Sequence, residues 1–363
     1  SDGNTLSPHL VGRPPQPFHA LVHLAGGANR MKHVFFIHSH ITWLVSRGVI
    51  HLHGLARTDV LFVSSRGYEP PNAEYERLDF PDRGWLLTWR IDRWLRLQRE
   101  LGRFVDQVAQ NGDFLWYLPH TALPFFAAFV GHPRCCGFHL IEEGLASYFT
   151  REALVEHMQR TLSCAPGRVG RMLSLWARLR PPEPADPRYL VAYGCTDEAF
   201  PGYARRTTVE IGGQLPTGDH DVNTVLVLDN ALEVGLVDEQ AFFKCFEEVV
   251  TKLAQVGHRS VHFKLHPGQY IDRRYTSRIQ RVLQDNPYGV LFKELPANYC
   301  LELLAATSRP DFYVFVSSVG FYAAVSGCRV YSMASRLATL DARYKTIFLD
   351  PMPEVVRRRI NFL

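Results

Sequence analysis

Short apolar runs alternate with longer amphipathic stretches from residue 32 onward. The run at residues 32–37 leads into a helical pattern over residues 41–55, and a second apolar run follows at residues 59–63. Strand, helix and strand at this spacing predict a βαβ unit, which requires a parallel sheet. Gly48 and Gly54 weaken the helical pattern, because glycine lowers helix propensity.

The alternation continues toward the middle of the chain. Apolar residues recur at helical spacing over residues 85–108, and apolar runs at residues 114–118 and 136–141 flank an apolar helix predicted at residues 121–130. We therefore predict one Rossmann-like domain at residues 31–187.

Residues 151–187 differ in composition from their surroundings. Five arginines stand among apolar residues between Arg160 and Arg180, and the proline-rich stretch 180–187 follows. Such a stretch cannot form a helix or a central strand, so we interpret it as a linker that ends the first domain. The basic segment is either a solvated, salt-bridged face or a docking surface for an anionic membrane or acidic acceptor.

The second half of the chain shows the same alternation. The continuous apolar run at residues 224–228 is typical of a strand buried on both faces. Helices and strands are then predicted in turn at residues 238–255, 260–265, 277–284, 290–292, 300–305, 312–316, 320–325 and 329–332. This order predicts a doubly wound α/β domain at residues 188–335.

Two such domains predict an α/β architecture in which two Rossmann-like domains face each other across a cleft. The length agrees, because 363 residues exceed the usual size of one hydrophobic core. Residues 1–30 are interpreted as an N-terminal extension or tag. Residues 336–363 are expected to pack back on the N-terminal domain.

Composition narrows the functional classes. The chain is 46% hydrophobic and 21% charged, with a formal net charge of +4, and this near balance gives no reason to expect a nucleic-acid partner. No apolar stretch reaches the roughly 20 residues that span a bilayer. The seven cysteines are scattered and odd in number, which favours reduced thiols. We expect a cytoplasmic protein, with the basic segment as a contact to the inner membrane.

Three polar segments directly follow apolar runs. They are Glu142-Glu143-Gly144, His266-Pro267-Gly268 and Ser317-Ser318. Ligands bind at the carboxyl ends of strands in α/β sheets. A carboxylate pair, a histidine and two hydroxyls at such positions predict a base, an acid and a phosphate site.

Each segment also has a structural interpretation. The carboxylates suit the N-terminus of a helix near Leu145. His266 is alternatively a loop histidine bonded to a backbone carbonyl, and Ser317 a plain helix cap. The arrangement favours a site, because the carboxylates lie in one predicted domain and the other two segments in the other.

In this order, the three motifs resemble the signature of bacterial sialyltransferases and polysialyltransferases. The resemblance covers residues 31 to about 335 and implies a glycosyltransferase-B fold with a CMP-activated nonulosonic acid as donor. It implies that Glu143 is the general base, with Glu142 as the alternative. His266 would be the acid or electrostatic partner of the departing CMP phosphate, and Ser317 and Ser318 would bind that phosphate.

Further donor contacts follow from the same resemblance. A looser match implies that Glu302 holds the ribose hydroxyls, with Glu294 competing for this role. Pro267 and Gly268 belong to the donor side. Lys264 either adds positive charge near the phosphates or lies exposed at a strand edge.

The acceptor side is expected around the first predicted strand. His38, Ser39 and His40 follow that strand, and we interpret them as lining of the cleft rather than as metal ligands. The implied reaction is an inverting transfer that needs no metal or other cofactor, because protein dipoles would stabilise the departing phosphate.

The implied acceptor is a bacterial surface glycan, either lipopolysaccharide or capsule. The motifs leave other activities open. These are transfer of Kdo or pseudaminic acid from CMP, a nucleotide-sugar epimerase of the same two-domain fold, and a non-catalytic glycan-binding protein.

Overall fold

The structure is a computed structural model. It describes residues 31–65, 67–71, 74–81, 91–110, 112–120, 125–150, 152–154, 156, 185–211 and 221–363. The predictions for residues 1–30 and for the basic segment from Arg160 to Arg180 fall outside the described residues.

The first domain is built on a sheet of seven parallel strands in the order β3-β2-β1-β4-β5-β6-β7. The strands are β1 (Lys32–Ile37), β2 (Val60–Ser64), β3 (Glu76–Asp79), β4 (Phe114–Leu118), β5 (Cys135–Ile141), β6 (Tyr189–Gly194) and β7 (Arg206–Thr208). Because β1 pairs with both β2 and β4, the chain winds outward in both directions from β1.

Helices connect these strands. They are α2 (His40–His53), η1 (Arg57–Asp59), α3 (Ile91–Ala109), α4 (Phe126–Val130) and η2 (Leu145–Tyr148). Ser39 begins α2 as a capping box with Thr42, and Gly54 ends it in the left-handed conformation at φ 58°. Gly54 therefore caps the C-terminus of the helix. It does not weaken the interior of the helix, as the sequence suggested.

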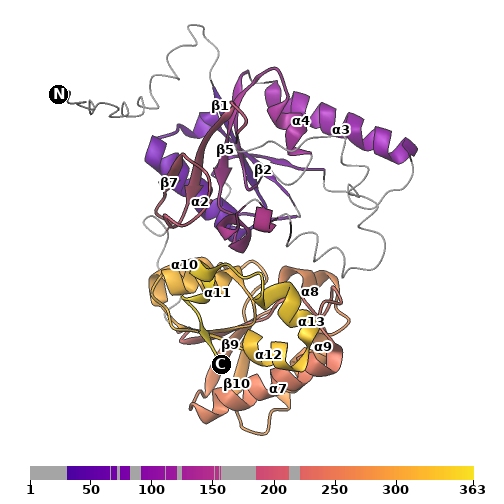
Figure 1. Cartoon of the computed structure of the whole chain (residues 1–363), viewed down its shortest axis with the longest axis vertical. Helices are drawn as coiled ribbons and strands as arrows, with labels where there is room; N and C mark the ends of the chain where they lie inside the picture. The colour runs from indigo at the N-terminus through magenta and orange to yellow at the C-terminus, as the bar shows by residue number, and fades with distance from the viewer. Residues whose placement is uncertain are drawn as a thin grey trace, which may run out of the picture.

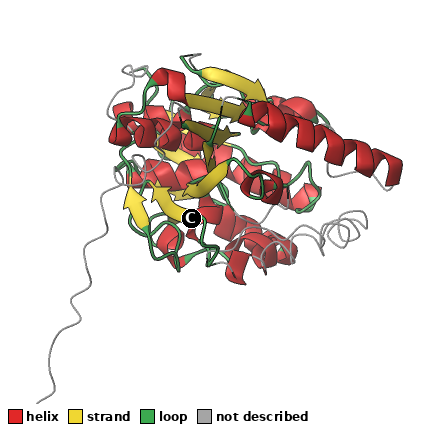
Figure 2. Ribbon diagram, turned by 90° about the horizontal axis from the view of Figure 1, so that it is seen from above, coloured by secondary structure: helices red, strands yellow, loops and turns green. Residues whose placement is uncertain are grey.

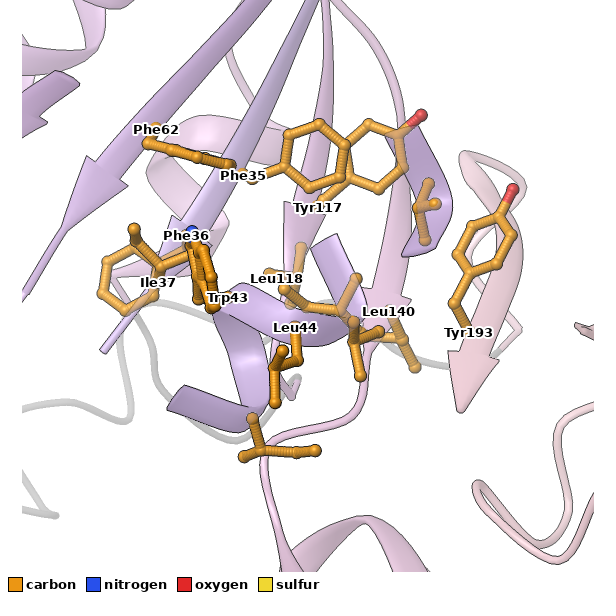
Figure 3. Close-up of a cluster of buried hydrophobic side chains, with 14 of the residues drawn as sticks. Phe35, Phe36, Ile37, Trp43, Leu44, Phe62, Tyr117, Leu118, Leu140 and Tyr193 are labelled. Carbon is orange, nitrogen blue, oxygen red and sulfur yellow. The ribbon is translucent and has the colours of Figure 1, made fainter. Parts of the chain in front are cut away.

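Aromatic side chains dominate the core of the first domain (Figure 3). Phe35 on β1 stacks on Tyr117 of β4, with ring centroids 4.0 Å apart, and Trp43 of α2 is 1% exposed. The strands β1, β2 and β4 are buried on nearly every residue, since helices cover both faces of the sheet. Burying each such large side chain stabilises the fold by about 2–3 kcal/mol.

The second domain repeats the design with six parallel strands in the order β10-β9-β8-β11-β12-β13. The strands are β8 (Thr224–Val227), β9 (Ser260–Lys264), β10 (Leu291–Glu294), β11 (Asp311–Val314), β12 (Val330–Ser332) and β13 (Asn361–Phe362). The helices are α7 (Glu239–Gln255), α8 (Pro267–Ile271), α9 (Thr276–Gln284), α10 (Leu301–Ser308), α11 (Ser318–Val325), α12 (Ala334–Leu340), α13 (Ala342–Tyr344), η3 (Lys345–Leu349) and α14 (Glu354–Arg357).

The two domains are stacked along the long axis of the molecule, with α10 and α11 on the side of the second domain that faces the first (Figure 1). Figure 2 shows helices on both sides of the strands. One hydrophobic cluster extends from the first sheet to α10 and α11, including Tyr148 and Phe321. The predicted α/β class with two doubly wound domains, the glycosyltransferase-B arrangement, is confirmed.

The predicted boundary between the domains at residues 187 and 188 is wrong. Strands β6 and β7 follow the proline-rich stretch and pair with β5 and with each other, so the first sheet extends to Thr208. The second sheet begins at Thr224. The proline-rich stretch therefore leads into strand β6 of the first sheet, and the chain crosses between domains at residues 209–223.

The C-terminal segment 336–363 contacts both domains. Its strand β13 extends the second sheet beside β12. Its helix α14 lies against η2 of the first domain, and Arg359 Nη2 donates to Glu198 Oε2 of that domain at 2.8 Å. Among the described residues, no helix is long and apolar enough to cross a membrane.

Candidate functional site

Glu143 stands at the carboxyl end of β5 with a histidine on either side. Its Oε2 lies 3.4 Å from His38 Nε2, and its Oε1 lies 3.6 Å from His120 Nε2. The backbone N–H of Glu143 donates to Ser147 Oγ of η2 at 3.1 Å, which fixes the turn after the strand. The Glu143 side chain is 11% exposed. A carboxylate held in this way can accept a proton from a hydroxyl brought beside it.

His120 is a site residue that the sequence analysis missed. It follows strand β4 in the order Leu118-Pro119-His120, so it lies just beyond a strand and beside a proline, as His266 does in the order Leu265-His266-Pro267. A histidine next to a proline at the end of a strand was therefore available as a signal at both positions.

Glu142 is directed away from its neighbour into the interior. It is fully buried, its Oε1 accepts a hydrogen bond from the Tyr322 hydroxyl at 2.6 Å, and its Oε2 accepts from the Cys195 backbone N–H at 2.6 Å. Burial raises the pKa of the Glu142 carboxyl, and the hydrogen bonds from Tyr322 and Cys195 oppose that rise. Enclosed as it is, Glu142 is not available to an acceptor, whereas Glu143 is partly exposed.

Gly144 brings the first motif against the third. It has φ 140° and ψ −155°, a region that is open almost only to glycine. A Cβ atom at Gly144 would lie 3.3 Å from Ser318 Cβ of the second domain. The backbone of Gly144, the residue after the candidate base, is therefore so close to Ser318, the first residue of α11, that a side chain on residue 144 would be crowded.

Ser317 and Ser318 lie at the start of α11, shortly after strand β11 ends at Val314. Ser317 is the N-cap, and its Oγ accepts from the Val319 backbone N–H at 3.2 Å. Both serines are half-buried. The N-terminus of a helix carries partial positive charge and free N–H groups, so this end of α11 suits a phosphate.

His266 caps helix α8 with its imidazole. Its Nδ1 accepts from the Gly268 backbone N–H at 3.0 Å, and its own backbone N–H donates to Gln269 Oε1 at 2.9 Å. Gln269 is fully buried and donates to Glu233 Oε1 at 3.0 Å. Burial and the positive charge of Lys264 lower the pKa of His266 to about 4.

The turn at Pro267-Gly268 leaves no room for a side chain at residue 268. A Cβ atom at Gly268 would lie 3.1 Å from Asn230 Nδ2 and 3.2 Å from His266 Nδ1. Asn230 follows strand β8, so it brings a third strand end to this region. The sequence analysis missed Asn230, because a lone asparagine in a loop carries no distinctive signal.

Lys264 is buried, which contradicts the alternative that it lies exposed at a strand edge. It is 6% exposed at the end of the interior strand β9, and its Nζ donates to the Ala297 backbone carbonyl at 2.7 Å. Burial lowers the pKa of Lys264 to about 8, and the negative charges of Glu302 and Glu294 oppose that change. A cation is thus kept close to His266.

The two candidates for the ribose contact differ in surroundings. Glu302 lies buried in the first turn of α10, where burial raises its pKa and the Cys300 Sγ contacts its Oε2 at 3.7 Å. Glu294 is exposed on the edge strand β10 and accepts from the Tyr270 hydroxyl at 3.1 Å. Glu302 is therefore buried inside the second domain, whereas Glu294 is exposed at the edge of its sheet.

The three predicted acceptor-side residues have different surroundings in the structure. Only His38 reaches Glu143, and Ser39 instead caps α2. His40 Nδ1 is 3.0 Å from the Tyr68 hydroxyl, and its ring bonds the backbone of Asn298 in the second domain. Burial, and then Lys264, lower the pKa of His40 to about 4, so His40 belongs to the region of Lys264 rather than to that of Glu143.

Two cavities in the described part of the chain lie away from these residues. One of about 500 Å³ is beside α2, and one of about 450 Å³ is between α7 and α9. No predicted site residue lines either cavity. Among the described residues, no group of three or more His, Cys, Asp or Glu side chains is arranged to hold a metal ion.

The chain was compared with known proteins. No protein-family model matches it, and no curated protein matches its sequence. Solved structures of similar fold include MnaA from S. aureus with UDP, at 9% identity and a TM-score of 0.48, covering 92% of each chain. A sialyltransferase from Photobacterium damsela has 11% identity and a TM-score of 0.46, covering 92% of this chain and 81% of the other.

A third similar structure is an α,α-trehalose-phosphate synthase (UDP-forming) from Burkholderia vietnamiensis. It has 10% identity and a TM-score of 0.45, covering 91% of this chain and 96% of the other. Likenesses this distant concern the path of the backbone and assign no substrate.

Proposed function

We propose that this protein is an inverting glycosyltransferase that transfers a nonulosonic acid from a CMP-activated donor to a hydroxyl of a bacterial surface glycan. The observation that carries the proposal is the close approach of the Gly144 backbone to Ser318, where a Cβ atom on residue 144 would lie 3.3 Å from Ser318 Cβ. The end of β5, which carries Glu143 on the first domain, thereby approaches the N-terminus of α11 on the second. A base and a phosphate site that face each other across two domains suit the transfer of a group between two bound molecules.

The acceptor half of the reaction belongs to Glu143. Its carboxylate takes the proton of the acceptor hydroxyl as the oxygen forms its bond to the anomeric carbon. His38 and His120 lie within 3.6 Å of the two carboxylate oxygens and hold them in place. Attack from the face opposite the departing phosphate inverts the anomeric centre.

The donor half belongs to the second domain. The bond between the anomeric carbon and the phosphate oxygen breaks, CMP leaves with the electron pair, and positive charge develops on the sugar. The neutral His266 ring donates from Nε2, because its Nδ1 is already an acceptor. Together with Ser318, the amides of α11 and Lys264, it stabilises the negative charge on the phosphate.

These groups would compensate the phosphate charge without a divalent cation. The chain does contain one Asp-x-Asp triplet, Asp219-His220-Asp221, in the connection between the domains. Residues 212–220 lie outside the described residues. Activity in the presence of EDTA therefore tests the metal-independent form of the proposal, and a loss of activity that Mg²⁺ or Mn²⁺ restores would count against it.

The identity of the donor is the direct test. Purified protein is incubated separately with CMP-sialic acid, CMP-Kdo, CMP-pseudaminic acid and UDP-GlcNAc, each with lipopolysaccharide or capsule oligosaccharide, and nucleotide release and glycan product are measured. We expect CMP release that depends on the acceptor and is abolished by Glu143→Gln. Glu210→Gln, an exposed glutamate of the same domain, is the matched control. Turnover by Glu143→Gln equal to that of the control would refute the assignment of the base.

A nucleotide-sugar epimerase is the second candidate. The observation that favours it is the presence of two histidines beside Glu143, since an epimerase needs several acid and base groups around one sugar. Conversion of UDP-GlcNAc without any acceptor, combined with tighter binding of UDP than of CMP, would establish this candidate in place of the transferase.

The acceptor and the location in the cell complete the proposal. A bacterial glycan as acceptor and a peripheral contact with the inner membrane through Arg160 to Arg180 come from the sequence. Sedimentation with vesicles that contain anionic lipid, for the intact chain and for a variant in which these arginines are replaced by glutamine, tests the membrane contact.

A further inference from the structure

Glu142 joins the two domains. Its Oε1 accepts the hydroxyl proton of Tyr322 at 2.6 Å, and its Oε2 accepts from the Cys195 backbone N–H at 2.6 Å. Glu142 and Cys195 belong to the first domain, whereas Tyr322 lies on α11 of the second domain. The carboxylate therefore connects the end of β5, the end of β6 and helix α11.

The Glu142 carboxylate is closely packed by its neighbours. A Cβ atom at Gly194 would lie 3.1 Å from Glu142 Oε2 and 2.5 Å from Ala199 Cβ, so only glycine fits there. Tyr322 is 1% exposed. A buried polar group that loses its partner costs about 1–3 kcal/mol, so separating the domains at this point is unfavourable.

The hydrogen bond also sets the position of α11 along the first domain. Ser318 and Tyr322 are four residues apart in α11 and therefore lie on one face of that helix. Tyr322 holds Glu142, and Ser318 touches Gly144, so Glu143 lies between two contacts with the same helix face. The rings of Tyr148 and Phe321 pack edge to face with their centroids 4.5 Å apart, which adds a third contact.

We propose that Glu142 and Tyr322 are positioning residues whose hydrogen bond holds the base Glu143 in register with the phosphate site at Ser318. Neither residue touches the reacting atoms. The inference rests on the proposed transferase function, and it gives the two adjacent glutamates separate roles. Glu142 fixes the distance between the two half-sites, and Glu143 does the chemistry.

The kinetic test uses Tyr322→Phe, which removes one hydroxyl and leaves the ring. We expect kcat to fall by about 10- to 100-fold, because a small misplacement of reacting groups has effects of that size. The dissociation constant for CMP should change by less than about twofold, since Tyr322 does not reach the nucleotide. The matched control is Tyr313→Phe, which removes a hydrogen-bonded hydroxyl of another buried tyrosine of the same domain, 3.1 Å from His258 Nε2.

Two further variants separate positioning from catalysis. Glu142→Gln keeps one oxygen that can accept from Tyr322, so it should retain measurable transfer, whereas Glu143→Gln should retain none. If Tyr322→Phe keeps kcat within about twofold while Glu143→Gln abolishes transfer, the positioning role is refuted and the transferase function stands.

A structural readout covers the case in which no CMP-sugar is turned over and the transferase function itself fails. Hydrogen exchange is measured in η2 of the first domain and in α11 of the second. Tyr322→Phe should accelerate exchange in both elements, and Tyr313→Phe in neither. Unchanged exchange of η2 in Tyr322→Phe would overturn the positioning role whatever the activity.

Discussion

The Nδ1 atom of His266 accepts a hydrogen bond from the backbone N–H of Gly268 at 3.0 Å. The imidazole therefore caps helix α8 with one nitrogen and leaves Nε2 to carry the proton of the neutral ring. Burial and the charge of Lys264 lower the pKa of His266 to about 4, so the ring of the free protein is neutral at physiological pH. His266 is thus prepared to donate a hydrogen bond to a phosphate without carrying a charge.

The first prediction concerns this tautomer. Nitrogen chemical shifts of His266 should show a protonated Nε2 and an unprotonated Nδ1 between pH 5.5 and 8, with no titration near the usual histidine value of about 6.5. The resonance is assigned by its absence in His266→Gln. A ring that becomes doubly protonated as the pH falls through 6.5 would contradict both the capping role and the lowered pKa.

The second prediction concerns Lys264. Its pKa is lowered to about 8, so its ammonium group loses its proton as the pH rises from 7 to 9. If Lys264 supports the phosphate, the affinity for CMP measured by calorimetry should fall by about tenfold over this interval, which corresponds to one ion pair. Lys264→Arg keeps its charge at pH 9, so its affinity should change much less. Equal pH dependence in both proteins would exclude Lys264 from the binding site.

The sequence predicted the strand ends but not how they face each other. Glu142 and Glu143 were equivalent in the sequence, because adjacent residues at a strand end point in opposite directions and either direction can be the open one. What distinguishes them is Tyr322, which lies 180 residues away and covers Glu142. A pattern read along one chain segment contains no information about such a contact.

Two of the strands that were missed, β3 and β7, share a physical cause. Strands β3 and β7 lie at the two edges of the first sheet and carry exposed polar residues, Glu76 and Arg77 in one and Arg206 in the other, so no apolar run marks them. Strand β6 has an apolar sequence, Tyr189 to Tyr193, and was available as a signal. It was overlooked because the prolines before it suggested a domain boundary.

The third prediction concerns stability against pH. The pKa of the buried His33 is lowered to about 4, so the unfolded chain binds a proton between pH 6.5 and 4 that the folded chain does not. The stability that neutral His33 contributes is present above pH 6.5 and is lost as the pH falls toward 4, by about 1.4 kcal/mol per pH unit. The buried carboxyls Glu142 and Glu302 have raised pKa values and act in the opposite direction, so the difference between variants is the informative quantity.

His33→Gln should therefore flatten the dependence of the unfolding free energy on pH between 6 and 4.5, as measured by urea denaturation. His51→Gln, at an exposed position of α2, serves as the control and should leave the slope unchanged. The explanation fails if the slope of His33→Gln equals that of the unsubstituted protein.

The last prediction separates two costs at Gly144. Its backbone region is open almost only to glycine, and an added Cβ atom would lie 3.3 Å from Ser318 Cβ. Gly144→Ala should lower the unfolding free energy by about 1–3 kcal/mol through backbone strain and abolish transfer through displacement of α11. Gly54→Ala is the matched control, because Gly54 has φ 58° but no atom within 4 Å of its Cβ position, so it carries a strain cost without the contact. Adding Ser318→Gly to Gly144→Ala removes the Ser318 side chain and leaves the strain, so stability recovered by the second change measures the overlap of the introduced methyl group with Ser318. If the double variant is no more stable than Gly144→Ala, the whole loss is backbone strain, and position 144 is not packed closely against Ser318.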